Sequence, residues 1–296
     1  MTLDLTPLAG ERVVLRENHP LEGRTTLRIG GPARVFAEVE DTSALAALLR
    51  FAAERGLPVL PLGKGSNILV PDAGFPGVAF VLAGDFSKVV IDGNVVHAGG
   101  GASLMSLAVL TKNAGLKGLE NLSGIPSSVG GAIRINAGAY GGEIFDVLRE
   151  IELVSRTGDV SRVDAKSIRW GYRWTELMER TDIVTAGVLE LESRPKEEVD
   201  ARFREVTEKR RNALPKKPNA GSIFKNPEGR YAGKLLEACG LKGRQVGAAQ
   251  ISEVHANVIV NLGGATAADV RALMAEMQAA VRERFGVELV PEVEVL

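Results

Sequence analysis

The sequence contains few of the residues from which metal sites, disulfides and thiol nucleophiles are built. It has a single cysteine, Cys239, and three histidines at scattered positions. One cysteine excludes an intramolecular disulfide and any metal site made of several cysteines. Three histidines without ligand spacing are not typical of a metal site. We therefore expect no metal, and we expect Cys239 to be a small side chain in a helix rather than a nucleophile.

An excess of one charge and long apolar runs are also missing. The 36 Lys and Arg residues nearly balance the 37 Asp and Glu residues, for a formal net charge of -1. This balance argues against a nucleic-acid partner. No run of about 18 apolar residues predicts membrane insertion, and the first residues do not resemble a signal peptide. We therefore expect a cytoplasmic protein.

What is present is an ordinary globular composition over 296 residues, long enough for two or three domains. Helical periodicity and capping signals predict helices at 42–55, 103–113, 196–211, 231–238 and 266–285. Runs typical of strands occupy 59–62, 68–70, 78–82, 95–98, 183–191 and 258–261, and a Thr-Gly-Asp turn predicts a hairpin of 151–155 with 160–163. This mixture indicates an α+β fold.

The most unusual segment is Gly118–Ile144, where glycine occupies positions 118, 124, 130, 131, 138, 141 and 142. No helical or strand period explains it, so we expect an irregular loop. Glycine permits positive φ and close backbone approach, which lets amides face phosphate oxygens or a flat ring. A second loop, Pro61–Val70, adds backbone amides, the Ser66 hydroxyl and the Asn67 carboxamide. Together the loops predict a dinucleotide-sized cofactor; a series of tight turns is the alternative.

Two common nucleotide-binding motifs are excluded. In the stretch GKGSNI, Ile68 takes the place of the third glycine of the Rossmann fingerprint. A strand-like run with Pro71 then follows where that fingerprint requires a helix. The sequence also contains no GxxxxGK[ST] motif, which disfavours a P-loop kinase or ATPase.

Further motifs extend the pattern beyond the two loops. They are RIGGPA (28–33), GYR (171–173), AGSIFKNP (220–227), AGKLLEACGLKG (232–243), HANVIVN (255–261) and LVPEV (289–293). In this order, with the loops, the sequence resembles the UDP-N-acetylenolpyruvoylglucosamine reductase family, in its shorter type without a tyrosine loop. Three positions depart from the family pattern: Ser127 replaces a usual Gly, Arg24 a common Asn and Val258 a usual aromatic.

The resemblance implies an FAD-binding fold of the vanillyl-alcohol-oxidase (PCMH) type with a C-terminal α+β substrate-binding domain. The implied domains are FAD-binding subdomain 1 at 1–75, joined by residues 287–296, FAD-binding subdomain 2 at 76–200, and the substrate-binding domain at 201–286. We expect a monomer or weak dimer.

The implied reaction is the NADPH-dependent, FAD-mediated reduction of UDP-N-acetylglucosamine enolpyruvate to UDP-N-acetylmuramate. This is an oxidoreductase step of peptidoglycan precursor synthesis, and so of cell-wall biogenesis, cell shape and division. NADPH is the co-substrate that supplies hydride. The flavin is expected to be non-covalent, because neither loop contains a His or Cys to attach it.

The same resemblance implies three catalytic residues. Ser222 would donate a proton, Arg173 would bind the substrate carboxylate, and Glu292 would assist the enolate-like intermediate. Without the motifs, Ser222 reads as a turn residue, Arg173 as a surface arginine and Glu292 as part of a solvated tail.

The loops are expected to supply the FAD contacts. These are Gly63, Lys64, Gly65, Ser66, Asn67, Ile68, Ser123, Gly124, Ile125, Pro126, Ser128, Gly131, Ala132, Asn136 and Gly138. Because the substrate carries a diphosphate, basic and polar contacts are expected, at Tyr172, Arg210, Lys225 and Asn226. The alternatives are an oxidase of the same fold and a catalytically inactive flavin- or nucleotide-binding module. The presence of all three catalytic matches favours the reductase.

Overall fold

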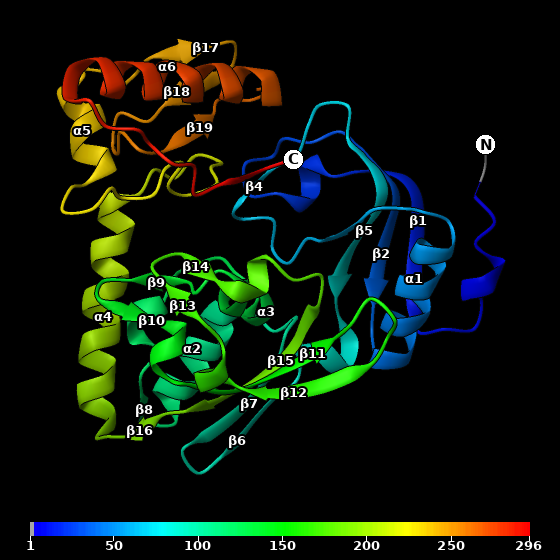
Figure 1. The fold of residues 1–296 in the computed structure, drawn as a ribbon. Helices are drawn as coiled ribbons and strands as arrows, with labels where there is room; N and C mark the ends of the chain where they lie inside the picture. Colours follow the sequence, from blue (N-terminus) through cyan, green and yellow to red (C-terminus); the bar gives the residue numbers. More distant parts are fainter. Residues whose placement is uncertain (1–2) are drawn as a thin grey trace. The chain divides into compact units, whose positions relative to one another are not determined.

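Figure 1 shows the fold in a computed structural model that describes residues 3–296. The chain packs into two compact units, and neither is continuous in sequence. Unit 1 consists of the described residues up to Glu17 together with Val35–Lys64 and Pro76–Glu208. Unit 2 consists of Asn18–Arg34, Gly65–Phe75 and Lys209–Leu296. The three-part division drawn from the sequence stays a prediction.

A four-stranded sheet runs in the order β1-β2-β5-β3 and lies mostly in unit 1. Its strands are β1 (Val13–Pro20), β2 (Pro32–Val39), β5 (Phe75–Leu82) and β3 (Val59–Pro61). Helix α1 (Thr42–Glu54) buries its apolar face in the same core. The helix begins where the sequence indicates, because the Asp41 carboxylate accepts a hydrogen bond from the Ala44 amide at 2.8 Å.

The second sheet of unit 1 is antiparallel throughout and has the order β12-β11-β15-β7-β6. Its strands are β12 (Val160–Asp164), β11 (Leu148–Val154), β15 (Ile183–Glu190), β7 (Val95–Gly99) and β6 (Val89–Asp92). Strands β11 and β12 form the hairpin predicted from the Thr-Gly-Asp turn. Helices α2 (Leu104–Asn113) and α3 (Val129–Arg134) share the core of this sheet.

The prediction of an irregular loop throughout Gly118–Ile144 is wrong in one part, because Val129–Arg134 form helix α3. Its glycines allow close packing and do not belong to an amphipathic pattern. The apolar periodicity of the sequence therefore does not indicate this helix. A Cβ at Gly130 would lie 2.7 Å from the Val184 carbonyl oxygen on β15. The helix can therefore approach the sheet only because this position lacks a side chain.

Unit 2 is built around the three-stranded sheet β17-β18-β19, with strands Gln245–Val246, Ala249–Ile251 and Ile259–Asn261. Helices α5 (Ala232–Ala238) and α6 (Ala267–Phe285) bury their apolar residues in its core. The final strand β20 (Glu294–Val295) pairs in parallel with β4 (Ile68–Leu69). The C-terminal residues are thereby tied to the end of the first glycine-containing loop.

Helix α6 has the predicted Thr cap and a C-terminal glycine with φ of 65°. The Thr266 and Asp269 side chains form a reciprocal capping box. The Asp72 carboxylate adds a second anionic cap, accepting from the amides of Ala267 at 2.7 Å and Ala268 at 3.1 Å. Negative charge at a helix N-terminus stabilises the helix because it opposes the helix dipole.

The remaining elements are one long helix and several short strands and turns. The long charged helix α4 spans Lys196–Ala213, and the two-stranded pairs are β8 (Leu116–Lys117) with β16 (Glu192–Ser193), β9 (Gly138–Ala139) with β10 (Gly142–Glu143), and β13 (Trp170–Gly171) with β14 (Trp174–Thr175). Single 3-10 turns occupy Thr6–Leu8, Glu22–Arg24, Gly84–Ser87, Glu120–Leu122, Ile144–Asp146, Ala165–Ser167 and Glu176–Met178. Within residues 3–296, no helix has both the length and the apolar character needed to cross a membrane.

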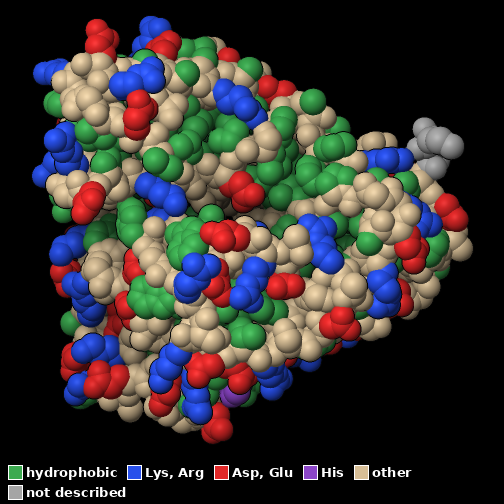
Figure 2. Space-filling model, viewed as in Figure 1, with side chains coloured by type: hydrophobic (Ala, Val, Ile, Leu, Met, Phe, Trp, Pro, Cys, Tyr) green, Lys and Arg blue, Asp and Glu red, His purple; other side chains and the backbone are tan. Residues whose placement is uncertain are grey.

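The surface carries both charges without segregation on the face in view. Figure 2 shows Lys and Arg side chains interspersed with Asp and Glu. This distribution agrees with the balanced charge of the sequence.

Candidate active site

The predicted site residues are divided between the two units. Unit 1 contains Gly63, Lys64, Ser123, Gly124, Ile125, Pro126, Ser128, Gly131, Ala132, Asn136, Gly138, Tyr172 and Arg173. Unit 2 contains Gly65, Ser66, Asn67, Ile68, Arg210, Ser222, Lys225, Asn226 and Glu292. Each group is described within its own unit.

The first loop has a backbone that only glycine adopts readily. Gly63 and Gly65 have φ of 56° and 60°, in the left-handed region. A Cβ at Gly65 would lie 2.1 Å from the Arg24 carbonyl oxygen, and one at Gly63 would lie 2.9 Å from Ser128 Oγ. The contact between Gly63 and Ser128 brings the two predicted cofactor loops together in unit 1. Glycine at both positions therefore lets the first loop pack closely against Arg24 and Ser128.

The second loop is held in shape by bonds to its own backbone. Ser128 caps α3, because its hydroxyl accepts a hydrogen bond from the Gly131 amide at 3.2 Å. Ser127, which departs from the family pattern, uses its amide internally by donating to the Ile125 carbonyl oxygen at 2.8 Å. Its hydroxyl donates to the Ser128 carbonyl oxygen at 2.9 Å. The Ser127 amide is therefore bonded within the loop.

Asn136 is part of the framework of the second loop. It is fully buried and has a left-handed φ of 49°. Its side-chain amide donates to Glu143 Oε2 at 2.8 Å and to the Gly171 carbonyl oxygen at 3.0 Å, and its Oδ1 accepts from the Phe145 amide at 3.4 Å. The side chain thus joins three segments of unit 1. Any contact of Asn136 with a cofactor stays a prediction.

Arg173 lies beside the second loop. It occupies the two-residue turn of the β13–β14 hairpin with Tyr172, has φ of 53°, and its guanidinium carbon lies 4.9 Å from the Tyr172 ring centroid. Its Nη2 donates to the Gly138 carbonyl oxygen, and its Nη1 is 3.7 Å from Glu143 Oε1. A guanidinium is permanently charged and can bind a carboxylate through two donors. Tyr172, Arg173 and Gly138 are thereby brought together.

In unit 2, the segments that contain Ser222 and Glu292 are paired with each other. Phe224 and Pro291 form an antiparallel bridge, and the Glu292 amide donates to the Ile223 carbonyl oxygen at 2.8 Å. The Asn67 side chain adds a bond from the first loop, donating to the Glu292 carbonyl oxygen at 3.0 Å. The Glu292 backbone is therefore bonded both to Asn67, a predicted cofactor residue, and to Ile223, which follows the predicted proton donor Ser222.

The other predicted substrate residues of unit 2 have different settings. Lys225 lies in the same paired segment, with its amide donating to the Val290 carbonyl oxygen at 2.9 Å. Asn226 lies just beyond, and its Oδ1 accepts from the Ala232 amide at the start of α5 at 3.0 Å. Arg210 lies in the last turn of α4. Their contacts with substrate stay predictions.

Two residues that support the site were missed in the sequence. The carboxamide of Asn257 accepts from the Phe224 amide at 3.0 Å and donates to the Phe224 carbonyl oxygen at 2.8 Å. It thereby fixes the backbone two residues after Ser222. The HAN motif is the signal in the sequence that indicates it. The second residue is Glu143, which has no distinguishing feature in the sequence beyond its place after the glycines.

Burial shifts the pKa values of two other reactive side chains, His255 and Cys239. Burial lowers the pKa of His255, with Lys242 adding to the effect and Glu237 opposing it. The neutral ring accepts a hydrogen bond at Nδ1 from the Asn257 amide at 3.2 Å. Burial raises the pKa of the Cys239 thiol, which makes it a poor nucleophile. Among residues 3–296, no group of three or more His, Cys, Asp or Glu side chains is placed to hold a metal ion.

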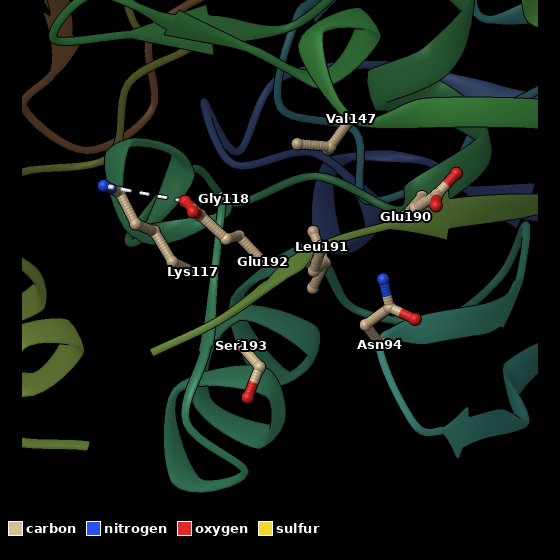
Figure 3. Close-up of a pocket in the computed structure, with 8 residues that line it drawn as sticks. All are labelled: Asn94, Lys117, Gly118, Val147, Glu190, Leu191, Glu192 and Ser193. Atoms are coloured by element: carbon tan, nitrogen blue, oxygen red, sulfur yellow. Dashed lines mark ion pairs between the residues drawn. The ribbon is translucent and has the colours of Figure 1, made fainter. Parts of the chain in front are cut away.

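A separate depression in unit 1 has a volume of about 460 Å³ and is shown in Figure 3. It is lined by Asn94, Lys117, Gly118, Val147, Glu190, Leu191, Glu192 and Ser193. Lys117 and Glu192 form an ion pair at 3.9 Å beside it. None of these residues is a predicted site residue.

Comparison with known proteins identifies the two parts of the chain. Residues 33–164 match the family model of an FAD binding domain, and residues 214–296 match that of the UDP-N-acetylenolpyruvoylglucosamine reductase C-terminal domain. The expected α+β fold, with an FAD-binding part followed by a C-terminal substrate domain, is confirmed by these matches and by a solved structure.

That structure is the UDP-N-acetylenolpyruvylglucosamine reductase of Thermus caldophilus, with 40% identity and a TM-score of 0.83 over 96% of this chain and 98% of that one. UDP-N-acetylenolpyruvoylglucosamine reductase 2 of Symbiobacterium thermophilum is 44% identical over 95% of this chain and 92% of its own. The Carboxydothermus hydrogenoformans reductase is 43% identical over 95% and 93%. Likeness at this level over nearly complete chains shows that the protein belongs to the UDP-N-acetylenolpyruvoylglucosamine reductase family.

Proposed function

We propose that the protein catalyses the NADPH-dependent reduction of UDP-N-acetylglucosamine enolpyruvate to UDP-N-acetylmuramate, a step of peptidoglycan precursor synthesis. The observation that carries the proposal is the pairing of the Ser222 and Glu292 segments, with the Glu292 amide bonded to the Ile223 carbonyl oxygen at 2.8 Å. It gives a proton donor and a carboxyl group a common support. The two glycine loops support a dinucleotide ligand, because Gly63 and Gly65 hold left-handed φ values that let backbone amides face phosphate oxygens or a flat ring.

FAD, when bound non-covalently by these loops, supplies the hydride chemistry between NADPH and the substrate. The residues of the chain then have to bind the substrate, stabilise charge and deliver a proton. Hydride addition at the β-carbon of an enolpyruvyl ether leaves negative charge on the α-carbon and its carboxylate. The Arg173 guanidinium stabilises that charge, since its cation and its paired donors match a carboxylate.

The α-carbon then requires a proton, which we assign to the Ser222 hydroxyl. A serine hydroxyl is a weak acid, so a neighbouring group must assist it. We assign that assistance to Glu292, whose main chain is fixed by Ile223 and by the Asn67 side chain. Lys225, Arg210, Tyr172 and Asn226 are proposed to bind the remainder of the UDP-linked substrate, with cationic groups facing its diphosphate. We further propose a monomer or weak dimer that works in the cytoplasm, where NADPH and a UDP-linked sugar are available in solution.

The test separates the two half-reactions. Ser222→Ala should still allow NADPH to bleach the flavin absorption anaerobically, whereas reoxidation by the enolpyruvyl substrate should fall by at least about 100-fold. Ser161→Ala is the matched control, because Ser161 is exposed on β12 and should leave both rates unchanged. Fast reoxidation in Ser222→Ala would contradict the assignment of the proton donor. A purified protein that cannot bind FAD would contradict the proposed function itself.

A further inference from the structure

Arg173 is held in place by its backbone and by the second glycine loop. It lies in a two-residue turn at a left-handed φ of 53°, and its side chain is 16% exposed. An arginine side chain has about 2 kcal/mol of rotamer entropy to lose when it is ordered, so a fixed guanidinium needs several partners. The Gly138 carbonyl oxygen is one of them, and it accepts from Nη2. Glu143 is another, because its Oε1 lies 3.7 Å from Nη1.

Glu143 is itself fixed from more than one side. Its Oε2 accepts the hydrogen bond from the buried Asn136 side chain at 2.8 Å. Its backbone amide donates to Asp146 Oδ2 at 2.7 Å, and its side chain accepts from the Asp146 amide in a reciprocal capping box. A carboxylate tied by these bonds cannot follow the motion of the guanidinium. The arginine has to orient toward it.

Asn136 links this carboxylate to the arginine's own turn. The same side-chain nitrogen that donates to Glu143 also donates to the Gly171 carbonyl oxygen at 3.0 Å. Gly171 pairs with Trp174 across the turn that contains Arg173. One buried carboxamide therefore sets both the backbone from which the arginine extends and the carboxylate beside its guanidinium.

We propose that Glu143 is a positioning residue for Arg173, anchored in that role by Asn136. The inference rests on the proposed function, since it takes Arg173 as the group that meets the substrate carboxylate. At 3.7 Å the pair is longer than a hydrogen bond of 2.7–3.2 Å, and the Glu143 charge is shared with Asn136 and the Asp146 amide. Glu143 thus orients the guanidinium through a long ion pair.

The test is Glu143→Gln, a change that removes the charge with little change of shape. Bleaching of the flavin by NADPH should stay within about 2-fold of the wild type. Reoxidation by the enolpyruvyl substrate should slow by roughly 10- to 100-fold, because misplacing a group that stabilises the transition state has effects of this size. The effect should appear in kcat, while KM and the substrate Kd from calorimetry change little. Unchanged reoxidation would overturn the inference. Faster reoxidation or tighter substrate binding would also overturn it, by showing that Glu143 competes with the substrate.

The matched control is Glu152→Gln. The Glu152 side chain is 21% exposed, against 25% for Glu143, and it pairs with Arg162 at 3.3 Å in the same unit. It should alter neither half-reaction. If Glu143→Gln fails to fold, as judged from melting and flavin content, Glu143→Asp replaces it. That variant keeps the charge but draws it back by one methylene, so it should also slow reoxidation, and normal reoxidation would overturn the inference.

A double-mutant cycle separates this inference from the proposed function. If Glu143 acts only through Arg173, then Glu143→Gln should add no further loss of reoxidation in an Arg173→Ala background. A full additional loss there would overturn the positioning role. If Arg173→Ala alone left reoxidation unchanged, the role of Arg173 in the proposed function would fail instead.

Discussion

Asn257→Ala should destabilise unit 2 and disturb Ser222 through the same two hydrogen bonds. The Asn257 side chain binds both the amide and the carbonyl of Phe224, at 3.0 and 2.8 Å. Phe224 is 1% exposed and Asn257 is 2% exposed, so water cannot replace either bond. Each buried polar group left without a partner costs about 1–3 kcal/mol, which predicts a loss of about 2–6 kcal/mol in the free energy of unfolding.

Urea titration and thermal melting measure this loss, and the melting temperature should fall by roughly 5–15 °C. Stopped-flow reoxidation measures the second consequence. Ser222 lies two residues before Phe224, and the Ile223 amide between them donates to the Asn257 carbonyl oxygen at 2.9 Å. We therefore expect reoxidation by the enolpyruvyl substrate to slow in protein that is still folded, while bleaching by NADPH is retained.

Two variants control for packing and for general sensitivity. Asn257→Asp keeps the acceptor for the Phe224 amide but places an oxygen against the Phe224 carbonyl oxygen, so it should also be destabilised. Asn113→Ala changes an exposed asparagine at the end of α2 and should alter stability by less than about 0.5 kcal/mol. If Asn257→Ala were as stable as Asn113→Ala, the reasoning from buried hydrogen bonds would be refuted.

Three further predictions follow from backbone geometry, capping and burial. Gly65→Ala should abolish FAD retention, measured as flavin content after purification, because its Cβ would lie 2.1 Å from the Arg24 carbonyl oxygen. The control is Gly93→Ala, at a similar φ of 58° but in open space, which should lower the free energy of unfolding by only about 1–2 kcal/mol. Asp72→Ala should lower stability in urea by about 1–2 kcal/mol through loss of the second cap on α6, and an unchanged midpoint would contradict this. Burial depresses the folded pKa of His255, so its contribution to stability is complete above about pH 6.5 and is lost as the pH falls toward the folded pKa. His255→Asn should therefore flatten the fall in melting temperature below about pH 6.5, and identical pH profiles for both proteins would count against the assignment.

Elements whose signals are local were predictable from the sequence. Helices α1 and α6 have caps and breakers within a few residues of their ends, and both begin at the predicted position to within one residue. Strands β1 and β2 were missed. In β1 three consecutive apolar residues, Val13–Leu15, are followed by the charged stretch Arg16–Glu17, and a strand's pairing depends on partners far along the chain. Helix α3 was not predicted because its glycines are required by close packing against strand β15, which the sequence alone does not show.

The candidate site also has residues that the sequence indicates and supporting contacts that only the folded structure determines. Glycine-rich stretches and short motifs are visible in the sequence, so the two loops could be selected from it, and the family resemblance carried by the motifs selected Arg173, Ser222 and Glu292. The bonds that support them join distant positions: Asn257 to Phe224, and Asn136 to both Glu143 and Gly171. An asparagine in a sequence carries no sign of which backbone groups it will satisfy. Only folding decides that, because a buried amide must find its partners among whatever segments pack around it.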